Sequence, residues 1–532
     1  MPHQLDDGKR PAVLVFCTYH PRDAAVHTQV VWFKRDLRLH DHAALAAAAC
    51  RGRVLPLYII EPELWRQPDS SSRHWQFIHS SLEDLANAIH RLGGNLHIRQ
   101  GPVIDIFARL RRQLGDYEIH SHEETGNAWT YARDLNLAAW CKDAGITWHE
   151  YRSNGVIRRL GNRDRWAALR NATLRKAQIE TPTSIQFETR SKADAVERLP
   201  AIDDPTFGAA TPRVQSGGRT QGLKVLESFL TDRSQRYMTT ISKPGVSARH
   251  CSRLSAHIAY GTLSVREIEQ ALSRRVDDLQ GLDDSASRHW ARQLQAFGSR
   301  LAWRCHFVQK LEQQPAIETH CMHPAFEGMR ENDFREDWFE AWSLGRTGYP
   351  LVDACMRSLH ANGWVTFRMR AMLVAFASYH LWLDWRRTAP FMARLFTDYE
   401  PGIHYSQFQM QSGVTGINAV RIYNPVKQSY DHDPEGRFIR RYLPELAAVP
   451  EEFIHEPWLM REPPPDYPAP IVEHEAAARQ AKLRMSAYRR GEDFREQSEQ
   501  VYRKLGSRKR APGKADRRKR VSEPLPQLTL DL

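Results

Sequence analysis

Two serine hydroxyl groups flank a basic residue in the run Ser252, Arg253, Leu254 and Ser255. The run lies at a predicted helix start, where backbone N–H groups lack partners within the helix and the helix dipole favours negative charge. A pyrophosphate is stabilised at such a place. Serine is also a preferred N-cap of ordinary helices, so these residues alone leave a purely structural role open.

The histidines and cysteines show little metal or disulfide patterning. The run His320-Cys321-Met322-His323 contains ligand types that zinc prefers, but no second ligand pair has a matching spacing. We therefore expect a loop before a helix there, and no metal centre. The seven cysteines are odd in number and form no CxxC pair. Their pattern argues against a disulfide framework and favours a reducing, cytosolic location.

The elements that must position these residues divide into two domains. Between residues 28 and 152, helical patterns such as His74–Leu92 alternate with short apolar runs. The runs are Val30–Phe33, Val54–Ile60, Leu96–Arg99, Tyr117–His120 and Ile146–His149. This alternation predicts an α/β domain with a doubly wound parallel sheet. The sheet has no GxGxxG turn, so we expect no dinucleotide in its usual crevice.

The remainder of the chain predicts helices. An Arg-, Pro- and Thr-rich stretch at 153–215 predicts an interdomain linker, and 216–460 predicts an all-helical domain. Its expected helices are Gly222–Arg233, Val265–Arg274, Ala291–Leu311, Leu351–Asn362 and Phe367–Leu383. We further expect a loose extension at 1–27, a Pro-rich segment at 461–504 with one charged helix near 473–504, and a basic disordered tail at 505–532.

The net charge of +12 favours a polyanion as partner, but most of it lies near the end of the chain. Residues 501–520 contain ten basic side chains and one acid. The run 508–520 predicts non-specific phosphate contacts or, equally well, a solvated charge run. No apolar run approaches the roughly 20 residues that cross a bilayer, so we expect no membrane association.

The run Val31–Asp41, reading VWFKRDLRLHD, resembles the opening signature of the photolyase and cryptochrome superfamily. Further matches follow in register at Ser252–Ser255, Thr347–Asp353, Asp384–Arg386, Arg421–Pro425 and Gly436–Leu446. The order and spacing agree with the family from about residue 28 to 460. The resemblance implies an α/β domain, a linker and a helical domain that binds FAD. It also implies either light-driven repair of ultraviolet pyrimidine dimers in DNA or blue-light reception.

The resemblance implies a set of FAD-binding residues: Tyr237, Ser252, Arg253, Leu254, Ser255, Arg370, Asp398, Tyr399, Glu400 and His404. Arg370 is expected to lie beside the flavin ring, where its charge lowers the free energy of an anionic reduced flavin. Asp398 balances that charge, although a structural ion pair between helices is the alternative. His404 replaces the asparagine that commonly faces flavin N5, and we expect its imidazole to change charge near neutral pH.

Repair in this family is electron transfer from excited reduced FAD to the lesion. The dimer is flipped out and packs on an aromatic side chain. Trp303 matches the family tryptophan that packs on the dimer, with an ordinary core tryptophan as the alternative. Arg300, Met410 and Arg421 are the other expected lesion or DNA contacts. Several positions depart from the family pattern: Arg300 replaces a glutamate, Phe367 an asparagine, Ala371 a methionine and Met410 a tryptophan. The Thr366-Phe367 pair stands where six-four photolyases carry histidines.

The family's chain of three tryptophans for flavin reduction is also altered. Only the middle member, Trp385, aligns, while Phe408 and Asn332 stand at the proximal and distal positions. The expected catalytic set is therefore Trp303, Trp385, His404 and Arg370. A substitute electron path could use other aromatic residues, namely Trp364, Trp382, Tyr399 and Tyr405.

The run Tyr405–Gly416, reading YSQFQMQSGVTG, resembles a divergent bacterial photolyase branch associated with cyclobutane dimers in single-stranded DNA. The iron–sulfur branch is disfavoured because no cysteine follows Cys355. No antenna signature is recognisable, so an antenna chromophore stays unknown. The end, Gln527–Leu532, is similar to the peptide by which bacterial proteins dock on the replication sliding clamp. We expect a cytoplasmic, nucleoid-associated bacterial monomer that binds UV-damaged DNA. A blue-light receptor without repair activity and a DNA-binding scaffold without flavin are the alternatives.

Overall fold

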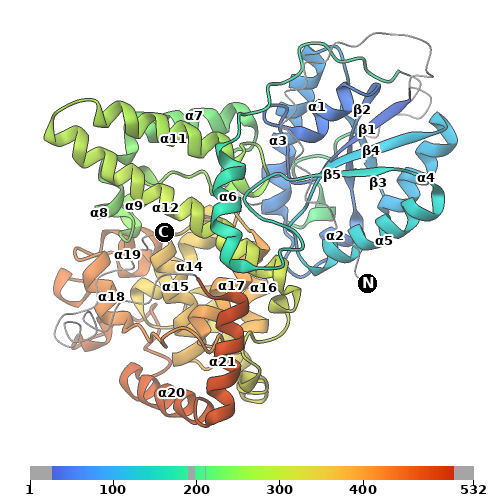
Figure 1. Ribbon diagram of the computed structural model, residues 1–532. Coiled ribbons are helices and arrows are strands. Elements are labelled where there is room, and N and C mark those ends of the chain that lie inside the picture. Colours follow the sequence, from blue (N-terminus) through green and yellow to red (C-terminus); the bar gives the residue numbers. More distant parts are fainter. Residues whose placement is uncertain (1–26, 190–197, 210, 212, 508–532) are drawn as a thin grey trace.

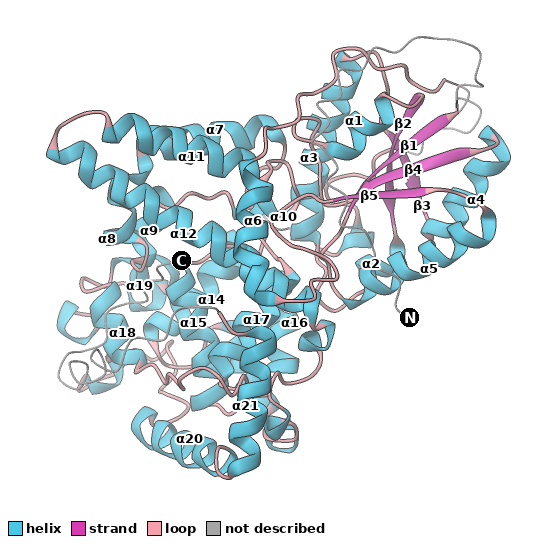
Figure 2. Ribbon diagram, in the orientation of Figure 1, coloured by secondary structure: helices cyan, strands magenta, loops and turns pink. Residues whose placement is uncertain are grey.

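The structure is a computed structural model in which residues 27–189, 198–209, 211 and 213–507 are described. The α/β domain contains a parallel five-stranded sheet in the order β3-β2-β1-β4-β5 (Figures 1 and 2). Its strands are β1 (Thr28–Phe33), β2 (Arg53–Ile60), β3 (His97–Gln100), β4 (Tyr117–His122) and β5 (Trp148–Tyr151). All five predicted strands are confirmed, with boundaries within a few residues.

Helices cover both faces of this sheet because alternate residues of β1 point in opposite directions. Val31 and Phe33 pack in one core with α1 (Ala43–Ala49) and α3 (Ser72–Arg91). Trp32 packs in the other core, with α4 (Val103–Leu114) and α5 (Ala128–Ala144). A short helix, α2 (Pro62–Trp65), follows β2. The strand order reverses between β1 and β4, and in such sheets ligands bind beyond the carboxyl ends of the strands at that point.

The predicted linker contains a helix, α6 (Trp166–Arg175), which the weak periodicity of its sequence did not indicate. Beyond it, Gln186 and Glu188 exchange backbone hydrogen bonds with Val54 of β2. These two hydrogen bonds attach the linker to strand β2 of the sheet.

The second domain is helical throughout its described residues, as predicted. Its first half contains α7 (Arg219–Thr231), α8 (Tyr237–Thr240), α9 (Pro244–His250), α10 (Ser255–Ala259), α11 (Val265–Gln280) and α12 (Ser285–Gln313). Its second half contains α13 (Glu336–Leu344), α14 (Pro350–Asn362), α15 (Phe367–Ala375), α16 (Trp385–Leu395), α17 (Pro401–Ser412), α18 (Pro425–His432) and α19 (Arg437–Tyr442). The long helix α12 packs against both α11 and α17.

Two helix predictions need correction. The expected helix Phe367–Leu383 changes to a π-helical turn at Phe376–His380 and ends before Trp382, whose φ of 52° is left-handed. The expected single helix near 473–504 is two helices, α20 (His474–Tyr488) and α21 (Glu492–Leu505). Gly491 separates them with a φ of 103°, a conformation that glycine adopts without the strain of a side chain.

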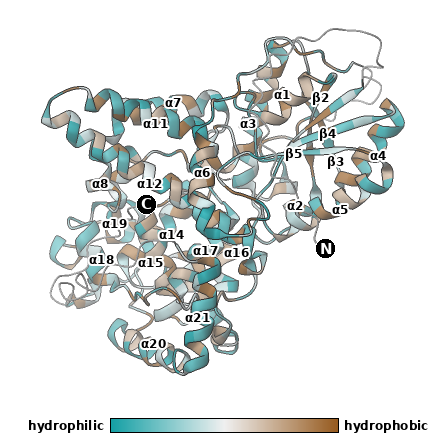
Figure 3. Ribbon diagram, in the orientation of Figure 1, coloured by the Kyte–Doolittle hydropathy of each residue, from teal (hydrophilic) through white to brown (hydrophobic). Residues whose placement is uncertain are grey.

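Helices α20 and α21 present mostly hydrophilic residues (Figure 3), and their apolar side chains pack into the helical core. The Phe494 ring stacks on the His323 ring with centroids 4.1 Å apart, and His323 Nε2 lies 3.1 Å from the Phe494 carbonyl oxygen. His323 Nδ1 accepts from the Ala325 N–H, so both ring nitrogens have protein partners. The run His320–His323 is the expected loop, and a short 3₁₀ helix (Pro324–Phe326) follows it.

Five described cysteines (Cys141, Cys251, Cys305, Cys321 and Cys355) are buried free thiols. Cys50 is disulfide-bonded, which the cysteine pattern did not predict. Within the described residues, no helix is both long enough and apolar enough to cross a membrane.

The signature loop after β1 joins the two domains. Arg35 donates hydrogen bonds to the carbonyl oxygens of Ala259 at 3.0 Å and Tyr399 at 2.8 Å, and Arg38 donates to that of Gly261 at 3.0 Å. A Cβ atom on Gly261, whose φ is 64°, would lie 2.2 Å from the Arg35 carbonyl oxygen. Only glycine permits this close approach of the two backbones. The most specific sequence motif therefore holds the domains in register.

Candidate cofactor and DNA-binding site

The run Ser252–Ser255 lies at a helix start, as expected, with α10 beginning at Ser255. Arg253 has a φ of 59°, and its guanidinium lies 4.2 Å from the centre of the Trp364 ring. Burial lowers the pKa of Arg253 to about 10, although the charge of Asp398 opposes the shift. An anionic group at this place would supply the missing negative charge.

Arg370 on α15 and Asp398 before α17 lie beside this run. Arg370 Nη2 donates to both carboxylate oxygens of Asp398, at 2.8 and 3.0 Å. Burial alone would raise the pKa of Asp398, but Arg370 and a hydrogen bond to the Ser255 side chain lower it overall. Asp398 is therefore ionised at neutral pH. Four of the predicted flavin-site residues, Arg253, Ser255, Arg370 and Asp398, form one cluster.

Other predicted cofactor residues lie around this cluster. The buried Tyr237 hydroxyl hydrogen-bonds to Arg300 on α12. Glu400 instead faces the domain boundary, where it accepts from Arg304 Nη2 at 2.8 Å and lies 3.9 Å from Arg35. Sequence reasoning did not identify Arg304, because its partner Glu400 is 96 residues away in the chain.

His404 on α17 is buried among aromatic rings. Its Nε2 donates to the Ala389 carbonyl oxygen at 2.8 Å, so Nδ1 carries the lone pair and acts as an acceptor. Burial lowers the pKa of His404 to about 3, despite the hydrogen bond to Ala389. The expectation that His404 changes charge near neutral pH is therefore wrong: the ring is neutral there.

The predicted lesion-side residues lie on three segments. Arg300 and Trp303 are on α12, Met410 is on α17, and Arg421 follows α17 in an exposed loop. Arg300 is exposed, while Trp303 and Met410 are half-buried. The Trp303 indole contacts the rings of His306 and Phe307, and its buried Nε1 has no hydrogen-bond partner among the described residues.

Phe367, another position that departs from the family pattern, is an exposed aromatic residue on α15. It is the first residue of α15, one turn before Arg370, and is 46% exposed. A single exposed apolar side chain is common on protein surfaces, so its relevance here rests on its place one turn before Arg370.

The expected electron relay is interrupted. Trp385 is fully buried and Asn332 is exposed, while Phe408 is buried with its ring 4.6 Å from that of His404. Over Trp382 lie the guanidinium groups of Arg330, at 4.5 Å, and Arg484, at 5.0 Å. The buried Arg330 alone would oppose a Trp382 radical cation by roughly 4 kcal/mol at an effective dielectric constant near 20. Trp382 is thus a poor relay.

A cavity opens at the carboxyl ends of β1 and β2, where the strand order reverses. We call it the switch-point cavity. Arg133 contacts Glu61 at 2.6 Å and Glu124 at 2.5 Å in its wall. Burial raises the pKa of Glu61 to about 7, although Arg133 opposes the shift. Asp69, His74 and Tyr399 also line the cavity.

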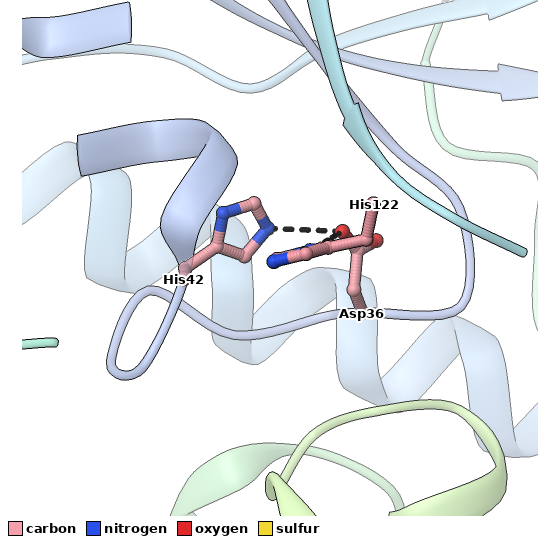
Figure 4. Close-up of side chains that lie close together, drawn as sticks. All are labelled: Asp36, His42 and His122. Atoms are coloured by element: carbon pink, nitrogen blue, oxygen red, sulfur yellow. Dashed lines mark hydrogen bonds and ion pairs between the residues drawn. The ribbon is translucent and has the colours of Figure 1, made fainter. Parts of the chain in front are cut away.

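Asp36, His42 and His122 form a buried cluster near the start of α1 (Figure 4). His122 Nδ1 lies 2.7 Å and His42 Nε2 3.0 Å from Asp36 Oδ2. His42 Nδ1 accepts from the Leu45 N–H, so the proton of the neutral ring is on Nε2, facing Asp36. A metal ion would need the lone pair at that nitrogen. The cluster therefore fits a structural tie between β4 and the signature loop.

Two family models match separate parts of the chain. The DNA photolyase model matches residues 29–162, and the model described as the FAD binding domain of DNA photolyase matches residues 297–487. The second match covers Trp303, Arg370 and Asp398. The excess of positive charge and the donors around Arg253 suit a phosphate-containing cofactor, so the residues present fit FAD.

Curated relatives and solved structures agree with these matches. A deoxyribodipyrimidine photo-lyase of Escherichia coli is 30% identical over 493 residues, covering 87% of this chain and 99% of the relative. A cryptochrome DASH of Natronomonas pharaonis is 27% identical, covering 84% and 98%. The crystal structure of an archaeal photolyase from Sulfolobus tokodaii with two FAD molecules matches with a TM-score of 0.72 and 26% identity, covering 86% of this chain and 100% of that one.

Fold, site and relatives lead to the same assignment. The α/β domain carries the family signature in its interdomain loop, and the helical domain carries the FAD-site cluster. The chain belongs to the photolyase and cryptochrome family, and its helical half is the FAD-binding domain of that family.

Proposed function

We propose that this protein uses light to split cyclobutane pyrimidine dimers in DNA, with reduced FAD as the electron donor. The observation that carries the proposal is the cluster of Arg253, Ser255, Arg370 and Asp398, in which Arg370 lies one helical turn after the exposed Phe367 on α15. The cluster is an electrostatic site for an anionic flavin, and Phe367 adds an exposed aromatic ring next to it for an extruded dimer.

When bound, FAD supplies the excited-state electron that opens the cyclobutane ring. The protein's own residues perform the other tasks. Arg253 and Ser255 would hold the phosphates, while Arg370, itself balanced by Asp398, would stabilise the reduced flavin. Trp303 would provide a flat face for the dimer. His404 is neutral and presents an acceptor nitrogen at the position that matches the family residue facing N5.

The decisive experiment illuminates chemically reduced protein with dimer-containing oligonucleotides, single-stranded and double-stranded in parallel. Loss of dimers, faster in the single strand, is expected from the resemblance of Tyr405–Gly416 to a branch that acts on single strands. Intact dimers in both substrates would overturn the proposal. The protein kept in the dark is the control.

A blue-light receptor without repair activity is the second candidate. Arg300, Phe367 and Met410 replace residues that commonly meet the lesion, and one relative is a cryptochrome DASH. Under this function, illumination changes the flavin and a partner interaction while dimers stay intact. The switch-point cavity is a candidate antenna site, since the Sulfolobus tokodaii relative contains a second FAD.

The proposed partner is UV-damaged DNA, and the proposed setting is the bacterial cytoplasm, with the protein as a monomer. The clamp-like peptide Gln527–Leu532 and the basic run 508–520 lie outside the described residues. Their roles stay predictions from the sequence. Deleting residues 508–532 would test both, through the salt dependence of DNA binding and through co-elution with a sliding clamp.

A further inference from the structure

A short hydrogen bond joins the two domains beside the flavin-site cluster. The Tyr399 hydroxyl donates to Asp69 Oδ2 at 2.5 Å, although the two residues are 330 positions apart in the chain. A distance this short is typical of a hydroxyl that donates to an ionised carboxylate. Both side chains are buried.

Asp69 is positioned to accept a proton. Asn127 Nδ2 donates to both of its oxygens, at 3.0 and 3.3 Å, and holds the carboxylate in place. No lysine or arginine among the described residues forms a salt bridge with Asp69. The Tyr399 O–H therefore points directly at an oxygen that could take its proton.

Tyr399 also contacts a predicted cofactor residue, because its ring lies 5.3 Å from that of His404. It follows Asp398 directly, its carbonyl oxygen accepts from Arg35, and its ring stacks on that of His74 at 5.6 Å. The Tyr405 side chain hydrogen-bonds to Tyr399 and follows His404 on α17. Tyr405, Tyr399 and Asp69 thus form a continuous chain from the helix that bears His404 to the switch-point cavity.

We propose that Tyr399 is a redox-active tyrosine that reduces the bound flavin under light, with Asp69 as its proton acceptor. This rests on FAD binding as proposed above. Tyr399 gives one electron to the excited oxidised flavin. Its O–H bond breaks as an O–H bond forms on Asp69, which leaves a neutral tyrosyl radical and a protonated carboxyl.

A thiolate that enters the switch-point cavity restores the pair. It gives one electron to the tyrosyl radical and leaves as a thiyl radical, while the proton on Asp69 returns to the Tyr399 oxygen. Two such cycles supply the two electrons of full reduction, and water supplies the one proton that the anionic reduced flavin takes up. The cavity reaches this site directly, because Asp69 and Tyr399 both line it.

The same structure disfavours the alternative route. A tryptophan loses an electron without a proton acceptor and becomes a radical cation, which the guanidinium groups over Trp382 oppose. Tyr399 develops no net charge, because its proton moves with the electron. The missing proximal tryptophan at Phe408 is therefore not needed.

The test follows flavin bleaching in the oxidised holoprotein under blue light with a small thiol. The variants Y399F and D69N should each slow bleaching at least about tenfold, whereas Y58F, which removes another cavity hydroxyl, should stay within about twofold of wild type. The D69N variant keeps Tyr399 but removes the proton acceptor. Transient absorption and electron paramagnetic resonance should detect a tyrosyl radical in wild type that is absent from Y399F.

Two results would overturn the proposal: wild-type bleaching in Y399F, or a loss of bleaching in W385F with no tyrosyl signal in wild type. A chain that serves only to tie the domains would lower the melting temperature of Y399F and leave bleaching unchanged. Repair by chemically reduced protein bypasses this step. If Y399F repairs dimers after chemical reduction, the proposed function holds whatever the bleaching experiment shows. If chemically reduced wild type does not repair dimers, the proposed function fails, independently of the role of Tyr399.

Discussion

One nitrogen of the Arg370 guanidinium donates to both carboxylate oxygens of Asp398. Ser255 and Arg253 also lower the pKa of Asp398, so the charge of this carboxylate does not depend on Arg370 alone. The Arg370 side chain is still 25% exposed, so the rest of its guanidinium group is available to a further anion. An ion pair that only held two helices together would not need this exposed surface.

Replacement of Arg370 by alanine should weaken FAD binding by about 30- to 150-fold, since the loss of a charged hydrogen bond and an unbalanced Asp398 cost roughly 2–3 kcal/mol. The double variant R370A/D398N should recover part of this loss. Flavin content and fluorescence titration of the apoprotein measure both. The control is R387A, whose exposed ion pair with Glu336 lies away from the cluster. Wild-type affinity in R370A would refute the role of Arg370.

Replacement of Trp303 by alanine should weaken binding of a dimer-containing oligonucleotide by roughly tenfold or more, because base stacking on an aromatic ring contributes about 1–3 kcal/mol. W303F should retain part of the affinity, and the flavin content of both should equal that of wild type. Fluorescence anisotropy is the measurement. W338A changes a half-buried tryptophan under Arg335 and serves as control. If W303A also loses flavin, Trp303 is a core residue.

The neutral His404 predicts a specific acid response. Its pKa is about 3 in the folded protein and near 6.5 in the unfolded chain, so stability falls as the pH drops from 6.5 toward 3. The variant H404N lacks this titration and should gain up to about 2 kcal/mol at pH 5 relative to its change at pH 8. Denaturant unfolding at both pH values measures the difference. Equal changes at the two pH values would contradict a neutral ring.

Lys310 on α12 should make the stability of the protein depend on pH in the neutral to alkaline range. Burial lowers its pKa to about 7, with Arg163 nearby and no salt bridge to a described carboxylate. Between pH 7 and 10.4 the lysine is neutral when folded and charged when unfolded, so stability rises with pH there and is lowest below pH 7. The variant K310M should gain up to about 5 kcal/mol at neutral pH and flatten this dependence. The exposed Lys224 provides the control K224M, and a destabilised K310M would refute the prediction.

The fold could be predicted closely because its elements have strong local signals. The strands β1 to β5 are short apolar runs, and the helices α11, α12 and α14 follow regular periodicity. The interruptions could not be predicted. The π-turn at Phe376–His380 lies in a continuously apolar stretch, and the break at Gly491 lies in a charged one, where periodicity says little.

The site divides in a similar way. Arg370, Asp398 and Ser255 could be assigned because they lie in motifs with a recognisable register. Asp69 could not, because nothing in its sequence surroundings signals a partner 330 residues away. The charge state of His404 depends on the rings and the Ala389 carbonyl packed around it, which only the folded structure supplies.

The guanidinium groups of Arg35 and Arg38 bind backbone carbonyl oxygens, not side chains, of the helical domain. Because these oxygens belong to the backbone, side-chain substitutions in the helical domain do not remove them. The lesion-facing residues can therefore change while the contacts between the domains are kept. An isolated helical domain, in contrast, would expose three carbonyl groups, including that of Tyr399 between the two acids Asp398 and Glu400. The flavin site is thus a property of the joined domains, and a fragment cut at the linker would lose the geometry of its own active residues.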